Sequence, residues 1–346
     1  MMGNKSSFIV VLIFFYSLAA EAQDFQYSQY YSAPLYLSPA FAGTEEHQRI
    51  TVNNRIQWPS LPKAFNNYSL SYDYNMKNLN SGVGLLLSTE QAGSAGLRNT
   101  SGAINYSYKV NFNKKWVVST GIYLGYTSRR IDPTKIVFGD QIDFGVDGVP
   151  SSDPVASQIT PVQYLDTGAG ILMYNRRVWL GAGFHHINQP NQSFLEGSSK
   201  LPMKYSIHGG IQIPLGNKTF QRGEAPSSIS PSFVFKSQGT FQQLDVGASF
   251  LYEPIIFGLW YRGIPFADNG TSFINHDAVV LLMGVRFHAF DVGYSYDASI
   301  SRLGADTGGA HEISIQYRFD TTNPAKVKRK DKFLPCPSFY GKASKK

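Results

Sequence analysis

The side chains of this 346-residue sequence that could carry out chemistry do not form a recognisable catalytic motif. His185 and His186 are adjacent, and because neighbouring residues on a strand point to opposite faces, we expect that they cannot hold one metal ion together. A serine–histidine pair stays open, but no nucleophile-bearing turn or acidic partner accompanies it. Neither a phosphate loop nor a dinucleotide fingerprint is present. We therefore expect a protein that is not an enzyme and binds no metal or cofactor.

Charged residues of both signs recur instead on one face of long alternating segments. Such residues support ion pairing, either with one another inside an enclosed space or with a charged segment of a partner. The first interpretation is structural, a salt-bridged interior that stiffens the protein. The second is functional, an interior that grips a client. The candidate residues are Arg55, Asp73, Arg262, Arg286, Asp291, Asp297, Glu312 and Arg318.

The segments that carry these charges alternate apolar and polar residues with a period of two, which predicts strands. They run for about nine to twelve residues, whereas strands of soluble sandwiches usually have about five or six. Their polar faces are rich in glycine and charge, and their apolar faces end in aromatic residues. This pattern is typical of a transmembrane barrel with a lipid-facing apolar band and a polar lumen. In one example, Phe290, Val292, Tyr294 and Tyr296 alternate with Asp291, Gly293, Ser295 and Asp297.

Fourteen such segments predict an all-β fold, an outer-membrane β-barrel of fourteen antiparallel strands in contact with the lipid bilayer. A basic residue facing lipid would cost about 2–4 kcal/mol at the midplane, so we expect the charges to point into the lumen. The connections between segments alternate between mostly short and long, and 214–228 is the exception. An even number of strands with short turns on the inner side places both ends of the barrel in the periplasm. The segments are 47–58, 64–75, 82–91, 99–110, 115–127, 162–174, 177–188, 203–213, 229–238, 241–252, 255–263, 277–288, 289–299 and 309–319.

The first 22 residues are typical of a secretory signal peptide. An apolar run from Phe8 to Leu18 follows Lys5, and small residues precede Gln23, where we expect cleavage. No later apolar stretch approaches the length of a helical membrane span. The sequence therefore divides into a signal peptide (1–22), a periplasmic apolar lead-in (23–46), the barrel (47–319) and a basic periplasmic tail (320–346).

The tail carries the whole net charge of +7, since residues 321–346 hold eight basic residues against Asp331. A neutral body with a basic tail argues against nucleic-acid binding, which needs basic residues spread over a face. The tail is either a solvated terminus or an electrostatic attachment to an acidic surface. Cys336, the one cysteine, is a bystander thiol or an intermolecular disulfide partner. The attachment residues would include Lys326, Lys328, Arg329 and Lys330.

The lead-in contains a stretch, residues 26–43, that has no charge and four tyrosines, yet is interrupted by Pro34 and Pro39. It is too apolar for a free tether and too rich in proline for a central strand. We expect it to be buried on the inner wall or rim of the periplasmic mouth. It is either an intramolecular plug or a docking strip for a periplasmic partner. The residues that would make these contacts are Tyr27, Tyr30, Tyr31, Leu35, Tyr36, Leu37 and Phe41.

Six stretches occur in an order that resembles the PorP/SprF family of type IX secretion system outer-membrane proteins. They are "QYSQYYSAPLYLSPAFAGT" at 26–44, "RIQW" at 55–58, "YSLSYDY" at 68–74, "YRG" at 261–263, "GYSYD" at 293–297 and "GAHEISIQYRF" at 309–319. The resemblance covers nearly the whole chain after the predicted signal peptide. It gives added weight to Arg55, Asp73, Arg262 and Glu312, which lie within these stretches.

The resemblance implies a non-enzymatic outer-membrane component of secreting or gliding Gram-negative bacteria. Its partners would be a secreted surface protein with a C-terminal secretion domain, often an adhesin, and other type IX secretion components. The alternative is a diffusive transporter of hydrophobic or small polar solutes. A transporter needs an open or gated lumen, whereas a retention module tolerates a blocked one.

Overall fold

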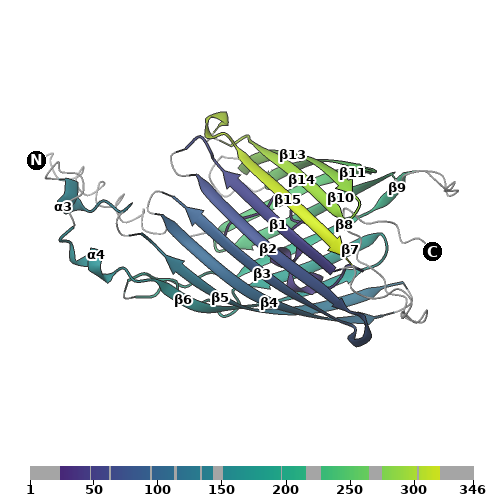
Figure 1. Cartoon of the computed structure of the whole chain (residues 1–346). Coiled ribbons are helices and arrows are strands. Elements are labelled where there is room, and N and C mark those ends of the chain that lie inside the picture. Colours follow the sequence, from purple (N-terminus) through teal and green to yellow (C-terminus); the bar gives the residue numbers. More distant parts are fainter. Residues whose placement is uncertain are drawn as a thin grey trace, which may run out of the picture.

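A computed structural model describes residues 24–46, 48–61, 64–93, 96–112, 115–132, 135–142, 151–195, 197–215, 227–264, 275–301 and 304–319. The predicted signal peptide, the basic tail and Cys336 lie outside these residues. Figure 1 shows the described chain as a closed barrel of tilted strands. Within it, no helix combines the length and apolar character needed to cross a bilayer.

The described residues form a closed antiparallel β-barrel of fourteen strands, which confirms the predicted fold. Each strand pairs with its neighbours, β15 pairs with β1, and β10 pairs with β11 to complete the ring. The strands are β1 (Gln48–Gln57), β2 (Phe65–Met76), β3 (Ser81–Ala92), β4 (Leu97–Asn111), β5 (Val117–Arg130), β6 (Val162–Tyr174), β7 (Val178–His185), β8 (Lys204–Ile211), β9 (Ile213–Leu215), β10 (Ser227–Gln238), β11 (Phe241–Tyr252), β12 (Ile255–Ile264), β13 (Asn275–Phe287), β14 (Phe290–Ser299) and β15 (Ala310–Phe319).

Segments β8 and β9 are two parts of one strand. Both pair with β10, and only Gln212 separates them. The ladder is interrupted beside Pro231 of β10, which has no backbone N–H to donate. The N–H of Gln212 instead donates to the carbonyl of Arg177 on the other side, at 2.6 Å. The proline therefore explains why fifteen segments make fourteen strands.

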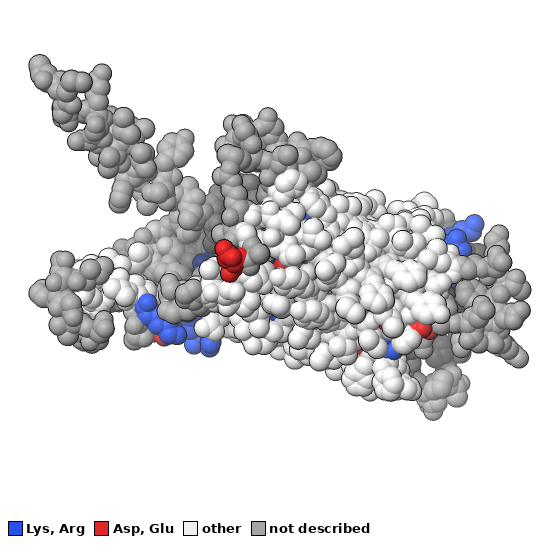
Figure 2. Space-filling model, turned by 90° about the horizontal axis from the view of Figure 1, so that it is seen from above, with Lys and Arg blue, Asp and Glu red and all other residues white. Residues whose placement is uncertain are grey.

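The alternating pattern sorts side chains between lipid and lumen. On β4 and β5, Ile104 and Ile122 are 66% and 61% exposed on the outer face, whereas Ser107 and Ser119 are fully buried inside. Figure 2 shows an outer face on which charged residues are sparse. Inside, strand register places opposite charges directly across from each other, as in Arg55 with Glu312 and Asp245 with Arg262. The cross-strand pairs therefore satisfy charges that could not face lipid.

The two ends of the barrel differ in their connections. We call one the short-turn end; it carries the short connections 77–80, 112–116, 175–177, 253–254 and 288–289. The opposite, long-loop end carries the connections 131–161 and 186–203, of which the first bears α3 (Gly139–Ile142) and α4 (Pro154–Gln158) (Figure 1). Gln48 pairs with Phe319, so the barrel begins and finishes at the short-turn end.

Residues 24–46, which we call the N-terminal strip, run through the whole lumen. Asp24 lies at the long-loop end, where Lys204 at the start of β8 contacts it. Gly43 lies at the short-turn end, where its carbonyl accepts a hydrogen bond from Lys109 near the end of β4. The strip was expected at the periplasmic mouth, but its first described residue lies at the end opposite to Phe319. The lumen offers buried partners along its entire length, and the strip follows them.

Local structure in the strip is confined to two short turns. Pro34 begins α2 (Pro34–Leu37), and Pro39 begins η1 (Pro39–Phe41). Proline is favoured at a helix start because its missing N–H would have no intrahelical partner there. Between them, the hydroxyl of Ser38 accepts a hydrogen bond from the N–H of Ala40 at 3.3 Å. The prolines therefore begin turns in a segment that cannot join the sheet.

The hydrophobic core of the molecule lies inside the barrel, and the strip supplies part of it. The ring of Tyr30 packs edge-on against Trp260, with centroids 5.3 Å apart. Burial of such aromatic surface offsets the entropy lost when the strip becomes ordered. The core residues are Tyr30, Leu37, Ala40, Val117, Leu172, Tyr174, Trp179, Val234, Leu251, Ile256, Trp260, Val280 and Leu282.

Lumen-facing glycines leave room for the strip where its backbone touches the wall. A Cβ atom on Gly121 would lie 2.4 Å from the carbonyl carbon of Pro39, and one on Gly82 would lie 2.1 Å from the carbonyl oxygen of Ala42. On β6, a Cβ at Gly170 would lie 2.1 Å from the hydroxyl of Ser38. These distances are far shorter than van der Waals contact, so the glycines are required by the seated strip.

We predict that Gly121→Ala destabilises the protein by about 1–3 kcal/mol, because the new methyl group overlaps the backbone of η1. Gly125→Ala is the matched control on the same strand and face, where the nearest atom to the new Cβ is 3.4 Å away. Thermal unfolding in detergent micelles, followed by heat-modifiable gel migration, measures both. Equal melting temperatures for the two variants would contradict the tight packing of the strip.

Candidate functional site

A buried network of ion pairs surrounds Ser28 of the strip. Arg55 pairs with Asp297 at 2.8 Å and with Glu312 at 3.4 Å, and Arg262 pairs with Asp297 at 2.7 Å. We call Arg55, Arg262, Asp297 and Glu312 the central network. They come from β1, β12, β14 and β15, so the network ties the first strand to three strands near the end of the barrel sequence.

The strip is hydrogen-bonded to every member of the central network. The hydroxyl of Ser28 accepts from Arg55 at 2.6 Å and from Arg262 at 2.8 Å, and it donates to Asp297 at 2.6 Å. The backbone N–H of Ser28 donates to Glu312 at 2.7 Å. A single short side chain therefore completes the network, and a larger one would separate the arginines from the carboxylates.

The other predicted lumen charges form two clusters nearer the short-turn end. Asp291 pairs with Arg286 at 3.2 Å and also with Arg318. Asp73 pairs with Arg49 at the start of β1 and is not in contact with the central network. The eight predicted residues thus all face the lumen but separate into three groups. Which of these charged residues group together depends on their position along the barrel axis. The alternation of apolar and polar residues does not encode that position.

The predicted contact residues of the strip lie against the barrel wall. Tyr27, Tyr30, Leu35 and Leu37 are buried, whereas Tyr31, Tyr36 and Phe41 are partly buried. The hydroxyl of Tyr30 donates to Ser232 at 3.0 Å. The same residues cannot contact a separate partner while the strip is seated.

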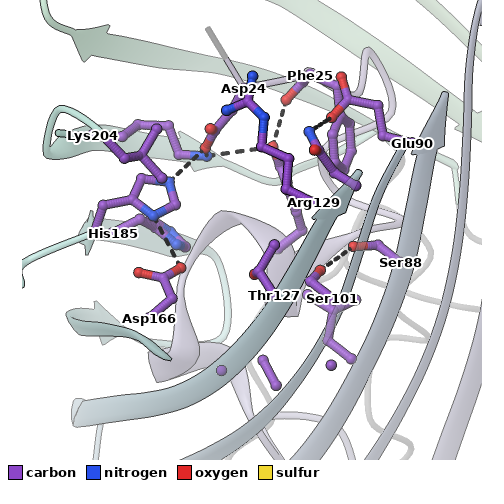
Figure 3. A pocket seen from close by; sticks show the side chains of 18 of the residues that line it. Asp24, Phe25, Ser88, Glu90, Ser101, Thr127, Arg129, Asp166, His185 and Lys204 are labelled. Carbon is purple, nitrogen blue, oxygen red and sulfur yellow. Dashed lines mark hydrogen bonds and ion pairs between the residues drawn. The ribbon is translucent and has the colours of Figure 1, made fainter. Parts of the chain in front are cut away.

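A second cluster holds the strip at the long-loop end, and the sequence did not reveal it. His186 contacts Asp24 at 2.8 Å and Asp166 at 2.9 Å, and Lys204 contacts Asp24 at 2.5 Å. Figure 3 shows Asp24, Lys204 and Asp166 converging from the strip and two strands. We call Asp24, Asp166, His186 and Lys204 the mouth latch.

The two adjacent histidines both face the lumen, contrary to the expectation that they point to opposite faces. His186 follows the last residue of β7 and has a φ of 57°, which turns its side chain back inside. The rings lie 6.3 Å apart. The turn-forming residues Asn188 and Pro190 that follow are the signal that alternation ends there.

Opposite charges shift the titration of the mouth latch. Burial alone would lower the pKa of His186, but the carboxylates of Asp24 and Asp166 raise it to about 9. Burial would likewise raise the pKa of Asp24, but Lys204 and His186 hold it well below its usual value. The latch therefore contains a charged imidazole at neutral pH.

The chain was compared with protein families, curated proteins and solved structures. The family model described as type IX secretion system membrane protein PorP/SprF matches residues 19–317. No curated protein matches the chain. Similar solved structures are Acinetobacter baumannii outer membrane protein Omp33 (9% identity, 80% of this chain and 100% of that chain, TM-score 0.42) and the P. putida toluene transporter TodX (10% identity, 82% and 93%, TM-score 0.45). A mutant of Rh. blastica porin is also similar (9% identity, 79% and 99%, TM-score 0.32).

We predict that Arg55→Met lowers the free energy of unfolding by about 3–5 kcal/mol, because Glu312 loses its arginine partner and stays buried. Arg98→Met, at an exposed position near the start of β4, should change it by less than about 0.5 kcal/mol. Guanidinium-induced unfolding in micelles measures both values. If the two substitutions cost the same, the central network does not stabilise the fold.

We predict a stability loss above neutral pH that depends on His186. Its folded pKa of about 9 exceeds the unfolded value of about 6.5. The contribution is therefore fully present below about pH 6.5 and is lost as the pH rises through about 9, by no more than about 3 kcal/mol. Thermal unfolding across this range should show the loss in the unmodified protein and in the control His276→Gln, but not in His186→Gln. The same slope in all three would contradict the prediction.

Proposed function

Since the chain belongs to the PorP/SprF family of type IX secretion system membrane proteins, we propose that it is a non-enzymatic outer-membrane component that supports export and surface attachment of secreted proteins. The observation that carries the proposal is the strip-filled lumen. A barrel whose interior is held by its own N-terminal segment serves as an anchored platform rather than as a conduit. The buried contacts of Ser28 with all four central network residues favour this role.

The clients would be adhesin-like proteins with a C-terminal secretion domain, in cells that secrete them and glide. We place the long-loop end outside the cell, because outer-membrane barrels carry their longer loops there. The client would then meet the loops of residues 131–161 and 186–203. Other type IX components would meet the short-turn end and the basic tail from the periplasm.

The alternative function, diffusive transport, requires a path for solute through the lumen. The seated strip and the ion pairs of the wall around it argue against such a path, since passage would separate buried charges from their partners. Transport stays possible only if the strip leaves. The two functions therefore differ in the state of the strip: transport of a solute requires the strip to leave the lumen, whereas the secretion role does not.

Pull-down of the tagged protein from its native envelope in mild detergent should recover type IX components or a large surface protein with a secretion domain. In a planar bilayer, the intact protein should conduct little, and a deletion of residues 24–43 should conduct more. Recovery of the barrel alone, with solute-selective conductance by the intact protein, would overturn the proposal in favour of transport.

A further inference from the structure

Two arginines lie next to each other on the outer surface of the barrel at the long-loop end. Arg98 near the start of β4 and Arg130 at the end of β5 are direct partners in the strand register. Their chain neighbours Asn99 and Arg129 face the lumen. Because successive side chains of a strand alternate between its two faces, Arg98 and Arg130 point outward. Both are exposed, and we call them the arginine pair.

The positive charge at this rim exceeds the negative charge. Among the described residues, neither member of the arginine pair has an ion-pair partner. Lys135 adds a third cation beside Gly96, and Asp132 is already paired with Lys135 at 3.4 Å. Like charges placed directly opposite each other destabilise an antiparallel sheet. The rim therefore favours an anionic ligand that would relieve this repulsion.

The arginine pair lies at the depth of the lipid headgroups. On the outer face of β5, the exposed ring of Tyr126 belongs to the apolar part of the wall, and Arg130 follows it by four positions. This spacing is about 14 Å along the strand. With the tilt of strands in such barrels, it is about 10 Å along the membrane normal. A headgroup layer is about 5–8 Å thick, and a long arginine side chain can bend back toward it.

A row of hydroxyl groups separates the arginine pair from the apolar wall. On the outer face, Thr89 of β3 is hydrogen-bonded to Thr100 of β4 at 3.3 Å, and Ser128 of β5 pairs with Thr100 in the register. Nearer the membrane centre, Ile104 and Ile122 are exposed on the same strands. From the centre outward, the surface therefore changes from apolar side chains to hydroxyl groups and then to cations.

A phosphorylated glycolipid matches this order of chemistry. Its acyl chains suit the apolar wall, its sugar hydroxyl groups suit the hydroxyl row, and its phosphate suits the arginine pair. Guanidinium groups bind phosphate through two parallel N–H bonds. The Cβ atoms of directly opposed residues lie about 4.5–5.5 Å apart, so both guanidinium groups can reach one phosphate. A soluble anion would use the arginines but leave the apolar wall and the hydroxyl row without a role.

We propose that the arginine pair binds a phosphate group of lipopolysaccharide, the phosphorylated glycolipid of the outer leaflet, whose acyl chains lie against β4 and β5. The sugar hydroxyl groups would meet Thr89, Thr100 and Ser128. The choice of the outer leaflet rests on the proposed function, which puts the long-loop end outside the cell. The phosphate chemistry of the rim does not depend on that orientation.

Binding of lipid A, the membrane anchor of lipopolysaccharide, to the purified protein in micelles of a neutral detergent tests the proposal. Native mass spectrometry compares lipid A that carries its phosphate groups with the same lipid A after their enzymatic removal. We expect removal of the phosphates to weaken binding at least about tenfold, because hydrogen bonds between charged groups are lost. Equal binding of the two forms, or binding of neither, would overturn the proposal.

Two double variants locate the site. Arg98→Gln with Arg130→Gln should weaken binding of phosphorylated lipid A about tenfold or more and leave binding of the phosphate-free form unchanged. Arg176→Gln with Arg177→Gln is the control, because it removes the same charge from exposed positions at the short-turn end. The first variant also relieves a like-charge pair, so we expect it to fold. An equal loss in both variants, or no loss in the first, would overturn the site.

The lipid that accompanies the protein from its own envelope identifies the source of the phosphate. Protein purified from its native outer membrane in mild detergent should carry lipid A, and the variant with Arg98→Gln and Arg130→Gln should carry less. A phospholipid held at these arginines in place of lipid A would overturn lipopolysaccharide as the ligand. So would binding of phosphatidylglycerol in micelles as tight as that of phosphorylated lipid A.

The envelope pull-down separates this inference from the proposed function. If type IX components are recovered but binding of lipid A does not depend on the arginine pair, the inference fails and the proposed function stands. If binding of lipid A depends on the arginine pair but no partner is recovered, the proposed function fails and the lipid site stands.

Discussion

A ring of fourteen strands encloses more space than its own side chains can fill, and this geometry governs the rest of the structure. Barrels of about eight strands are filled by their side chains, whereas much larger ones leave an aqueous channel. This chain lies between those limits and uses its N-terminal strip as filling. The apolar core inside the lumen includes Tyr30, Leu37 and Ala40 of the strip. The strip thus forms part of the core of the barrel.

Because the strip has little regular structure, most of its backbone carbonyls need partners from the wall. The carbonyl oxygen of Ala40 accepts from Ser119 at 2.8 Å, and that of Ala42 accepts from Ser107 at 2.7 Å. Polar lumen residues that resemble a channel lining in the sequence are therefore hydrogen-bonded to the strip. Together with the charges around Ser28, they fix the position of the strip along the axis.

The sequence predicted the strands well because alternation reports which face a residue lies on. Segments 162–174 and 229–238 formed strands β6 and β10 although Asp166 and Pro231 disturb their patterns. Alternation does not report the path of a segment without periodicity, so the sequence did not reveal that the strip runs from one mouth to the other. It also fails where a strand ends, which is why the inward turn of His186 and the mouth latch were missed.

The position of Asp24 has a consequence for the order of events during biogenesis. In the orientation proposed above, a chain end still tethered in the inner membrane would not reach the far mouth of an outer-membrane pore. A leader such as the one expected at residues 1–22 would therefore have to be removed before the strip is seated, and proteolysis would become the licensing step for maturation. Until then the barrel would lack the strip in its lumen, so processing of the leader and assembly of the barrel would be coupled.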